Sequence, residues 1–263
     1  MNENVLNHEQ IAAIKKCGKY LSQVLDIVVS NIKPGVSTKS LDLIAEEELK
    51  KRGCTPSFLN YFIEGVGHYP ASLCVSINDE IVHGLPTHQN IVKEGDIVSL
   101  DLGANFSGVC TDMAVTVIAG EKDEVEPRMS QLVEVTKRAL VEGIKAAKIG
   151  NTIGDIGFAV EQYVLDHDLV VIKDYVGHGI GTKPHMWPQI PNYGKSGSGP
   201  KIIEGMALAI EPMVTLEDAA TIVHSNNWTV KTANGLNAAH FEHTVVIENG
   251  KPVIVTRSKG IGE

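Results

Sequence analysis

The stretch SLDLGANFSGVCTDMAVTV, residues 99–117, holds two acidic residues inside two apolar runs. The runs are rich in β-branched residues and flank the turn sequence ANFSG, so they predict a buried β-hairpin. A turn centred between Phe106 and Ser107 would place Asp101 and Asp112 directly opposite each other, with Cβ atoms about 4.5–5.5 Å apart. Like charges at that separation destabilise a sheet, and a buried charge needs a partner or a metal. The hairpin therefore predicts a positive group between Asp101 and Asp112.

The composition argues against several classes of partner. The chain has 263 residues, 43% of them hydrophobic, and a formal net charge of −9. Its 23 Lys and Arg residues are scattered, which leaves no basic patch for nucleic acid or an anionic membrane. No apolar run approaches the roughly 20 residues that span a bilayer. The four cysteines lack CxxC spacing and the first residues do not resemble a signal peptide, so we expect a reducing cytoplasm.

Helical and strand patterns alternate along the chain. Apolar residues at helical spacing predict helices over residues 8–31, 37–52, 127–148 and 153–165. Asn7 and Gln10 suit a capping box at the start of the first helix, and Gly53 marks the end of the second. The segments ASLCVSIN, IVSLDLG and CTDMAVTVI are predicted to be strands.

An internal repeat indicates two related halves. The segment EGDIVSLD at 94–101 is repeated as EGMALAIE at 204–211, and each follows a His-Gly pair, at His83 and at His178. The shared order predicts a single catalytic domain, residues 1–263, built from halves of roughly 1–120 and 130–263 around one site. The glycine- and serine-rich stretch 192–200 is then expected to be a surface loop.

Two further acids lie on predicted strands, Glu211 in AIEPMV and Glu242 in HFEHTVVIE. One acid on a strand is more often an edge residue or a turn cap, but four on apolar strands favour ligation. His178, between two glycines that permit close backbone approach, adds an imidazole. Four carboxylates and one imidazole favour two divalent cations roughly 3.5–4 Å apart. Co, Mn, Fe and Zn all suit these ligands.

Strand alternation separates the histidines that flank Glu242. His240 is expected to share the face of Glu242, whereas His243 is expected to point away from it. The alternation assigns neither histidine a role in the chemistry.

The motifs SLDLG, CTDMA, GHGIG, AIEPMV and FEHTVV resemble, in order and spacing, those of type 1 methionine aminopeptidases of the pita-bread superfamily. The resemblance covers nearly the whole chain. It implies an α+β pita-bread fold, with two pseudo-symmetric halves whose antiparallel sheets surround a central dinuclear metal site and whose helices lie outside. It also implies that Asp101 and Asp112 chelate one ion, that His178 and Glu211 bind the other, and that Asp112 and Glu242 bridge both.

The same resemblance implies an activity, the hydrolytic removal of N-terminal methionine from peptides or nascent proteins. Glu211 would shuttle the proton, His185 would stabilise the tetrahedral intermediate, and His83 would contact the scissile nitrogen. His83 and His185 would thus also bind substrate, together with the residues around the methionine side chain, Tyr69, Cys74 and Trp228.

Length helps to place the chain within the superfamily. The interval between Glu211 and Glu242 is too short for the helical insertion of type 2 enzymes. We expect neither the extra N-terminal domain usual in prolidases nor the cysteine-containing extension of eukaryotic cytosolic type 1 enzymes. We therefore expect the minimal bacterial form, a cytoplasmic monomer that acts on peptide or nascent-chain N-termini near the ribosome.

Two segments depart from the pattern of the family. YFIEGVGHYP at 61–70 is several residues longer than usual. Pro184 replaces an aromatic residue before His185, and Met186 and Trp187 replace two acids after it. We expect methionine to remain the preferred first residue and the outer groove to tolerate apolar downstream residues.

Two alternatives remain. One is an aminopeptidase of the same fold with another specificity, such as cleavage before proline. The other is a non-catalytic pita-bread module that binds peptides. Such modules have generally lost some metal ligands, and this chain keeps all five, which argues against a purely binding role.

Overall fold

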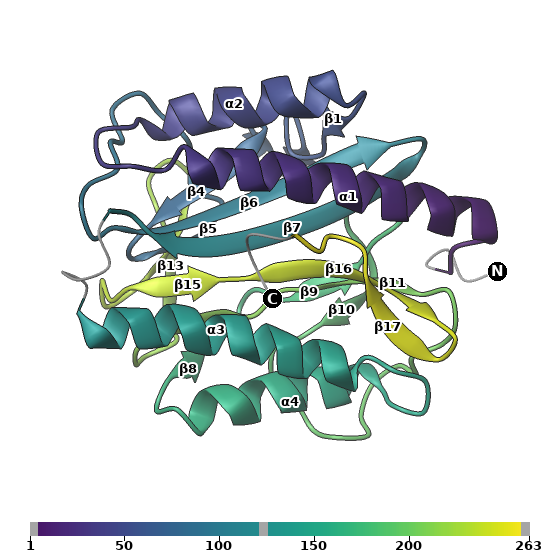
Figure 1. The fold of residues 1–263 in the computed structure, drawn as a ribbon. Helices are drawn as coiled ribbons and strands as arrows, with labels where there is room; N and C mark the ends of the chain where they lie inside the picture. The colour runs from purple at the N-terminus through teal and green to yellow at the C-terminus, as the bar shows by residue number, and fades with distance from the viewer. Residues whose placement is uncertain (1–4, 121–125, 259–263) are drawn as a thin grey trace.

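A nine-stranded antiparallel sheet forms the centre of the protein, in a computed structural model that describes residues 5–120 and 126–258. Its strands run in the order β1-β6-β7-β16-β11-β9-β10, with β4 paired to β6 and β17 paired to β16. The two halves of the chain meet where β7 pairs with β16 (Figure 1). The strands are β1 (Thr55–Pro56), β4 (Leu73–Ile77), β6 (Ile97–Phe106), β7 (Val109–Ile118), β9 (Gly177–Gly179), β10 (Met186–Ile190), β11 (Ala207–Ile210), β16 (Glu242–Glu248) and β17 (Lys251–Ile254).

Within the described residues, four helices pack in two pairs on one face of this sheet (Figure 1). α1 (His8–Ser30) and α2 (Thr38–Lys51) cover strands of the first half, whereas α3 (Pro127–Ala146) and α4 (Ile153–Leu165) lie over the second. Asn7 and Gln10 form the expected capping box. The four predicted helices are confirmed to within about two residues at either end, the usual uncertainty of a helix boundary.

Alternation along β6 separates the apolar core from the polar face. Leu100 and Leu102 are fully buried and belong to the apolar cluster that α1 and α2 share with the sheet. Asp101 lies between them, so its side chain points to the face opposite the helices. The helices cover one face, and the other face is left for polar side chains.

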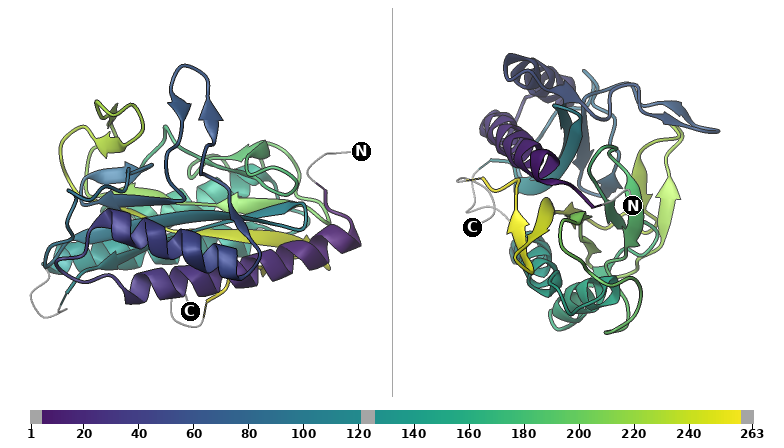
Figure 2. Two further views of the ribbon diagram at one scale, coloured as in Figure 1. Left: turned by 90° about the horizontal axis from the view of Figure 1, so that it is seen from above. Right: turned by 90° about the vertical axis from the view of Figure 1, so that its right-hand side faces the viewer.

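The described residues also form three smaller antiparallel sheets, in the orders β15-β12-β8, β13-β14-β5 and β2-β3. The β2–β3 hairpin projects from the side of the molecule opposite α1 and α2 (Figure 2, left). These strands are β2 (Phe62–Ile63), β3 (Gly67–His68), β5 (Glu80–Val82), β8 (Val170–Val171), β12 (Met213–Thr215), β13 (Thr221–Val223), β14 (Val230–Thr232) and β15 (Ala238–His240).

The predicted register of the β6–β7 hairpin is wrong by two residues. Asp101 pairs with Ala114 and Asp112 pairs with Gly103, so the two acids are diagonal neighbours and not directly opposite. The turn residues are Ser107 and Gly108, with φ of 50° and 78°. Two left-handed residues make the turn that matches the twist of a hairpin, and the glycine at 108 permits it. Because the shift is even, both acids stay on one face.

An antiparallel sheet with helices gathered on one face confirms the expected α+β class. No helix within residues 5–120 and 126–258 is both long and apolar enough to cross a membrane. Residues 1–4, part of the stretch that argued against a signal peptide, lie outside the described residues. Residues 192–200 form no helix or strand and are mostly exposed, which confirms the predicted loop.

Candidate active site

Each predicted metal ligand lies on, or directly after, one of five adjacent strands of the central sheet. In sheet order these are Asp101 on β6, Asp112 on β7, Glu242 on β16, Glu211 directly after β11, and His178 on β9. Asp101 pairs with Ala114, which pairs with Glu242. His178 pairs with Ala209, two residues before Glu211. Paired residues, and residues two apart on a strand, share a face, so strand pairing brings all five side chains together.

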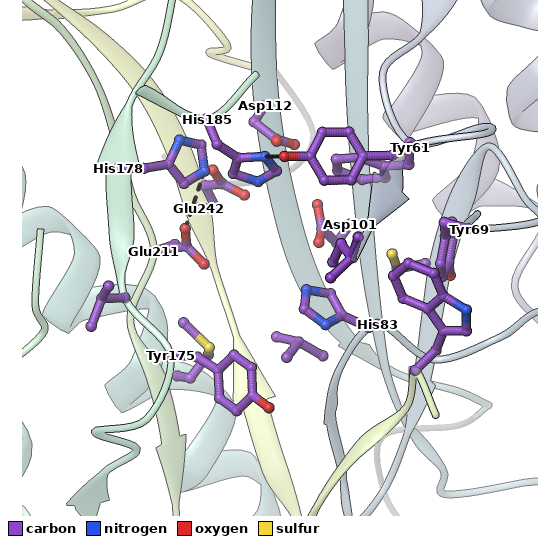
Figure 3. A pocket seen from close by; sticks show the side chains of 17 residues that line it. Tyr61, Tyr69, His83, Asp101, Asp112, Tyr175, His178, His185, Glu211 and Glu242 are labelled. Atoms are coloured by element: carbon purple, nitrogen blue, oxygen red, sulfur yellow. Dashed lines mark hydrogen bonds and ion pairs between the residues drawn. The ribbon is translucent and has the colours of Figure 1, made fainter. Parts of the chain in front are cut away.

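These side chains line a cavity of about 300 Å³ (Figure 3). The cavity wall contains all ten site residues predicted from the sequence: Tyr69, Cys74, His83, Asp101, Asp112, His178, His185, Glu211, Trp228 and Glu242. The structure therefore brings the whole predicted set to one place, while the role of each residue remains a prediction.

The carboxylates of the cavity are poorly solvated. Asp112 and Glu242 expose only 3% and 2% of their surface. One oxygen of Asp101 and one of Glu242 have no hydrogen-bond partner among the described residues. Burial raises the pKa of Asp101 to about 7 and raises the pKa values of Asp112, Glu211 and Glu242 well above their usual range. Buried carboxylates without partners destabilise a fold, and bound cations would offset that cost.

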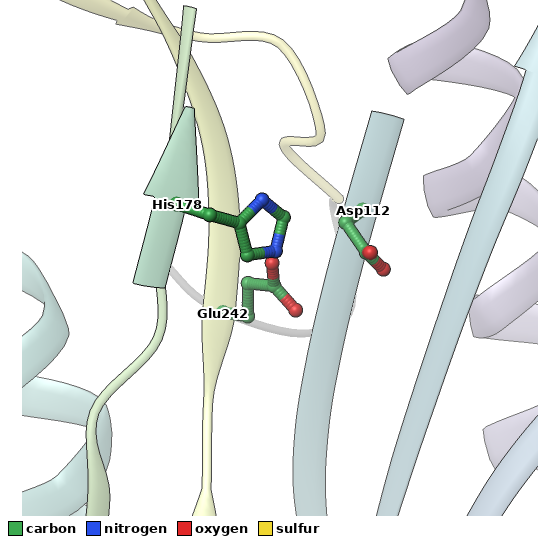
Figure 4. Close-up of side chains that lie close together, drawn as sticks. All are labelled: Asp112, His178 and Glu242. Carbon is green, nitrogen blue, oxygen red and sulfur yellow. The ribbon is translucent and has the colours of Figure 1, made fainter. Parts of the chain in front are cut away.

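Asp112, His178 and Glu242 form a close group whose ligand atoms all lie within 4.8 Å of one another (Figure 4). His178 Nδ1 donates to the Gly179 carbonyl oxygen at 3.0 Å, which leaves the lone pair on Nε2, 3.4 Å from Glu211 Oε1. Burial lowers the pKa of His178 to about 3 and keeps the ring neutral, as a metal ligand must be. Carboxylate oxygens and a neutral imidazole fit a divalent metal ion.

The glycine after His83 and the glycine after His178 each stand where a side chain would not fit. A Cβ at Gly84 would collide with the Val75 carbonyl oxygen, and one at Gly179 with the Trp187 carbonyl oxygen. His83 has a φ of 57°, a left-handed conformation that costs a non-glycine residue free energy and recurs at functional sites. The His-Gly repeat thus places both imidazoles where the backbone is closely packed.

Two further histidines lie close to the carboxylates, His185 beside His178 and His83 near Asp101 (Figure 3). The ring of His185 lies 4.4 Å from that of His178, and its Nδ1 lies 3.0 Å from the Tyr61 hydroxyl. The ring of His83 lies 5.9 Å from that of Tyr175. Burial lowers the pKa of His83 to about 4 and also lowers the pKa of His185. Both rings are therefore neutral hydrogen-bonding groups at pH 7.

An apolar compartment adjoins the ligand cluster. Cys74 pairs with Asp101 across β4 and β6, so its side chain shares the face of the carboxylate. The Tyr69 ring packs edge-on against Trp228 at 5.1 Å, and its hydroxyl donates to the Gly84 carbonyl oxygen at 2.9 Å. These residues belong to a separate apolar cluster that includes Phe58. The compartment suits an apolar side chain held beside the carboxylates.

Comparisons with known proteins agree with this geometry. The sequence profile of metallopeptidase family M24 matches residues 12–249. The chain belongs to metallopeptidase family M24. It is 42% identical over 252 residues to a methionine aminopeptidase of Clostridium acetobutylicum, with 96% of this chain and 98% of the relative covered. Its identity to a methionine aminopeptidase of Aquifex aeolicus is 44%, with 95% and 97% covered.

Solved structures confirm the pita-bread fold of this M24 metallopeptidase. The methionine aminopeptidase of Thermotoga maritima superposes with a TM-score of 0.91 at 40% identity, covering 97% of this chain and 99% of that one. The prolidase of Pyrococcus furiosus superposes with a TM-score of 0.76 at 20% identity, and the match covers 97% of this chain but 66% of the prolidase. The likeness to methionine aminopeptidases thus extends to the sequence, whereas the likeness to prolidase is one of fold.

Three residues of this M24 metallopeptidase lie at the cavity or its ligands without a role predicted from the sequence. His240 is buried, and its Nε2 lies 3.6 Å from Glu211 Oε2. Alternation predicted its face but not this contact, because Glu211 comes from a different strand. Tyr61 and Tyr175 line the cavity beside His185 and His83, and no local sequence pattern distinguishes them from other tyrosines.

Proposed function

We propose that this M24 metallopeptidase removes N-terminal methionine from peptides and nascent proteins by hydrolysis at two divalent metal ions. The observation that carries the proposal is the meeting of five ligand-type side chains, two neutral histidines and an apolar compartment at one cavity. The methionine aminopeptidases that match almost the whole chain support the same activity.

The five ligand-type residues would divide between the two ions. Asp101 and Asp112 would hold one ion, His178 and Glu211 the other, and Asp112 and Glu242 would bridge both. Four carboxylates carry more negative charge than one divalent ion neutralises, which favours a pair, and Co, Mn, Fe or Zn would suit the donors. Two such ions, held by these residues, would supply a water molecule of pKa about 7 and positive charge for the scissile carbonyl and the free α-amino group.

The protein supplies the proton transfers and the hydrogen bonds. Glu211 takes the proton of the attacking water and returns it to the leaving amine. His185 donates a hydrogen bond to the carbonyl oxygen as the carbon becomes tetrahedral, and His83 contacts the scissile nitrogen. The side chain of the first residue occupies the compartment formed by Tyr69, Cys74 and Trp228.

An aminopeptidase with another specificity, such as cleavage before proline, is the second candidate. Its support is weaker, because the prolidase likeness is 20% in sequence and the match covers 66% of the prolidase. A purely peptide-binding role is disfavoured by the retention of all five ligand-type residues at the cavity.

The remaining parts of the proposal concern the setting of the reaction. We place it in the cytoplasm, near the ribosome, with the chain acting as a monomer on emerging N-termini. Residues 1–263 would form a single catalytic domain of two halves, 1–120 and 130–263, and the pairing of β7 with β16 supports that arrangement. The net charge of −9 does not favour nucleic acid as a partner.

A peptide assay tests the activity. The metal-free protein and the protein supplied in turn with Co, Mn, Fe and Zn are offered peptides that begin Met-Ala, Met-Leu and Ala-Pro. We expect metal-dependent release of methionine from Met-Ala peptides and none of alanine from Ala-Pro peptides. Release of the residue before proline would favour the second candidate, and turnover that survives metal removal would refute the dinuclear mechanism.

A further inference from the structure

Two segments next to cavity-lining residues in the sequence carry exposed apolar side chains. Phe62, Ile63 and Val66 on the β2–β3 hairpin expose 59%, 38% and 36% of their surface, and Trp187 on β10 exposes 56%. We call these four side chains the apolar rim. The hairpin and β10 both lie on the side of the molecule away from α1 and α2 (Figure 2, left).

The apolar rim gathers several exposed apolar side chains in two short segments. Among the described residues, twelve large apolar side chains are exposed, and four of them belong to these two short segments. Single exposed apolar residues are ordinary, but contiguous ones beside a pocket mark binding surfaces. Both segments are also the ones that are expected from the sequence to depart from the family pattern.

Both segments of the apolar rim are linked to His185, one through a contact of Tyr61 and the other through the sequence. Ile63 itself lines the cavity, and Tyr61, two residues earlier, contacts His185. The base of the hairpin is closed by hydrogen bonds between Tyr69 N and Tyr61 O and between Asn60 N and Tyr69 O, both 2.9 Å long. Trp187, which lies on β10, comes two residues after His185 in the sequence. Both segments of the apolar rim are therefore adjacent in the sequence to residues of the cavity wall.

We propose that the apolar rim binds the third to fifth residues of the substrate polypeptide and favours apolar side chains there. The inference rests on the proposed aminopeptidase activity, which puts the first residue in the cavity and the second at its mouth. An extended chain advances about 3.3 Å per residue, so the next residues leave the cavity past the rim. β10 is an edge strand of the central sheet and β2–β3 is an isolated pair, and strand edges accept an extended peptide.

Peptide kinetics test the rim directly. Met-Ala-Leu-Phe and Met-Ala-Ser-Asn are compared on the metal-loaded wild type, on Phe62→Ser with Trp187→Ser, and on Leu165→Ser. Leu165 is an equally exposed apolar residue at the end of α4, far from the rim in the fold. The wild type should favour the apolar peptide in kcat/KM by about fourfold to fifteenfold, the effect of burying one to two methylene groups.

The rim variant should bring that ratio close to one, and Leu165→Ser should keep the wild-type ratio. Because the readout is a ratio on one protein sample, partial unfolding of a variant does not imitate the effect. A wild type without preference, or a rim variant that keeps it, would overturn the proposal. So would a wild-type dimer that the rim substitutions dissociate while the ratio stays unchanged, since the rim would then be a self-association surface.

A binding experiment separates the rim from the proposed activity. A peptide that starts Met-Ala and carries a photoreactive benzophenone side chain at the third position is crosslinked to the wild type, and the labelled residues are mapped. Labelling within residues 62–68 or at Trp187 supports the rim even if no methionine is released, in which case only the proposed function fails. Labelling confined to other surfaces refutes the rim even in an active enzyme.

Discussion

The Tyr61 hydroxyl lies 3.0 Å from Nδ1 of His185, so a residue at the base of the β2–β3 hairpin is a hydrogen-bond partner of a predicted catalytic histidine. Burial lowers the pKa of His185 and keeps its ring neutral. A neutral imidazole that accepts the tyrosine proton at Nδ1 carries its own proton on Nε2. Nε2 is then the donor for the substrate carbonyl oxygen, as the proposed mechanism requires.

Tyr61→Phe should reduce kcat by about tenfold, the effect of losing one hydrogen bond of about 1.4 kcal/mol, with little change in KM or metal content. His185→Ala should reduce kcat on the order of 10²-fold, again with the metals in place. The double variant should be no slower than His185→Ala alone, because Tyr61 acts through the histidine. Independent, multiplicative losses would show that Tyr61 has a different role, and loss of metal from His185→Ala would make His185 a ligand.

Asp112→Asn should abolish turnover and lower the metal content below two ions per chain. Asp112 is the proposed bridge between the ions, its side chain is buried, and an amide cannot bind two cations as a carboxylate does. Elemental analysis after dialysis against the chosen metal gives the number of ions per chain. Leu165→Ser, dialysed in the same way, controls for metal lost during preparation. Two retained ions with normal turnover would refute the dinuclear assignment.

Metal affinity should increase as the pH rises through neutrality. Burial raises the pKa of Asp101 to about 7 and those of the other three carboxyl groups well above their usual range, so protons occupy the site at lower pH. A cation must displace these protons, and binding therefore releases them. The raised pKa of Asp101 also means that the metal-free fold loses stability at this group as the pH rises from the unfolded carboxyl pKa through about 7, and bound metal would offset that loss.

Titration calorimetry in two buffers of different ionisation enthalpy measures the released protons at each pH. We expect the number released to be larger at pH 6 than at pH 8, because fewer carboxyl groups remain protonated at the higher pH. Binding heats that do not depend on the buffer would show that the carboxylates are already ionised in the metal-free protein.

Site residues could be predicted from the sequence where they interrupt or complete a local sequence pattern. Asp101 and Asp112 could be found because acids interrupt apolar strands, and His178 because glycines enclose it. The register of Asp101 could not be fixed, since the choice between two turn centres depends on the backbone conformation of Gly108. The contacts of Tyr61 with His185 and of His240 with Glu211 join distant segments, and only the strand order and the hairpin geometry decide them.

His240→Leu should lower kcat/KM by about tenfold while both metal ions remain bound. His240 is buried with its Nε2 3.6 Å from Glu211 Oε2, and neither ring nitrogen has a hydrogen-bond partner among the described residues. Burial lowers the pKa of His240, so the neutral ring offers one N–H close to the proposed proton shuttle. Losing a polar contact of about 1.4 kcal/mol lowers kcat/KM by about tenfold, and the apolar leucine side chain cannot supply that contact.

His240→Gln keeps a donor in nearly the same volume and should recover part of the loss, whereas His88→Leu, on an exposed loop residue, should change nothing. The readouts are kcat/KM on a Met-Ala peptide and metal content by elemental analysis. Equal losses in the Leu and Gln variants would assign His240 to packing, and a loss of metal from either would make it part of the ligand set. A donor role requires the graded result, because the glutamine side chain has an N–H group and the leucine side chain has none.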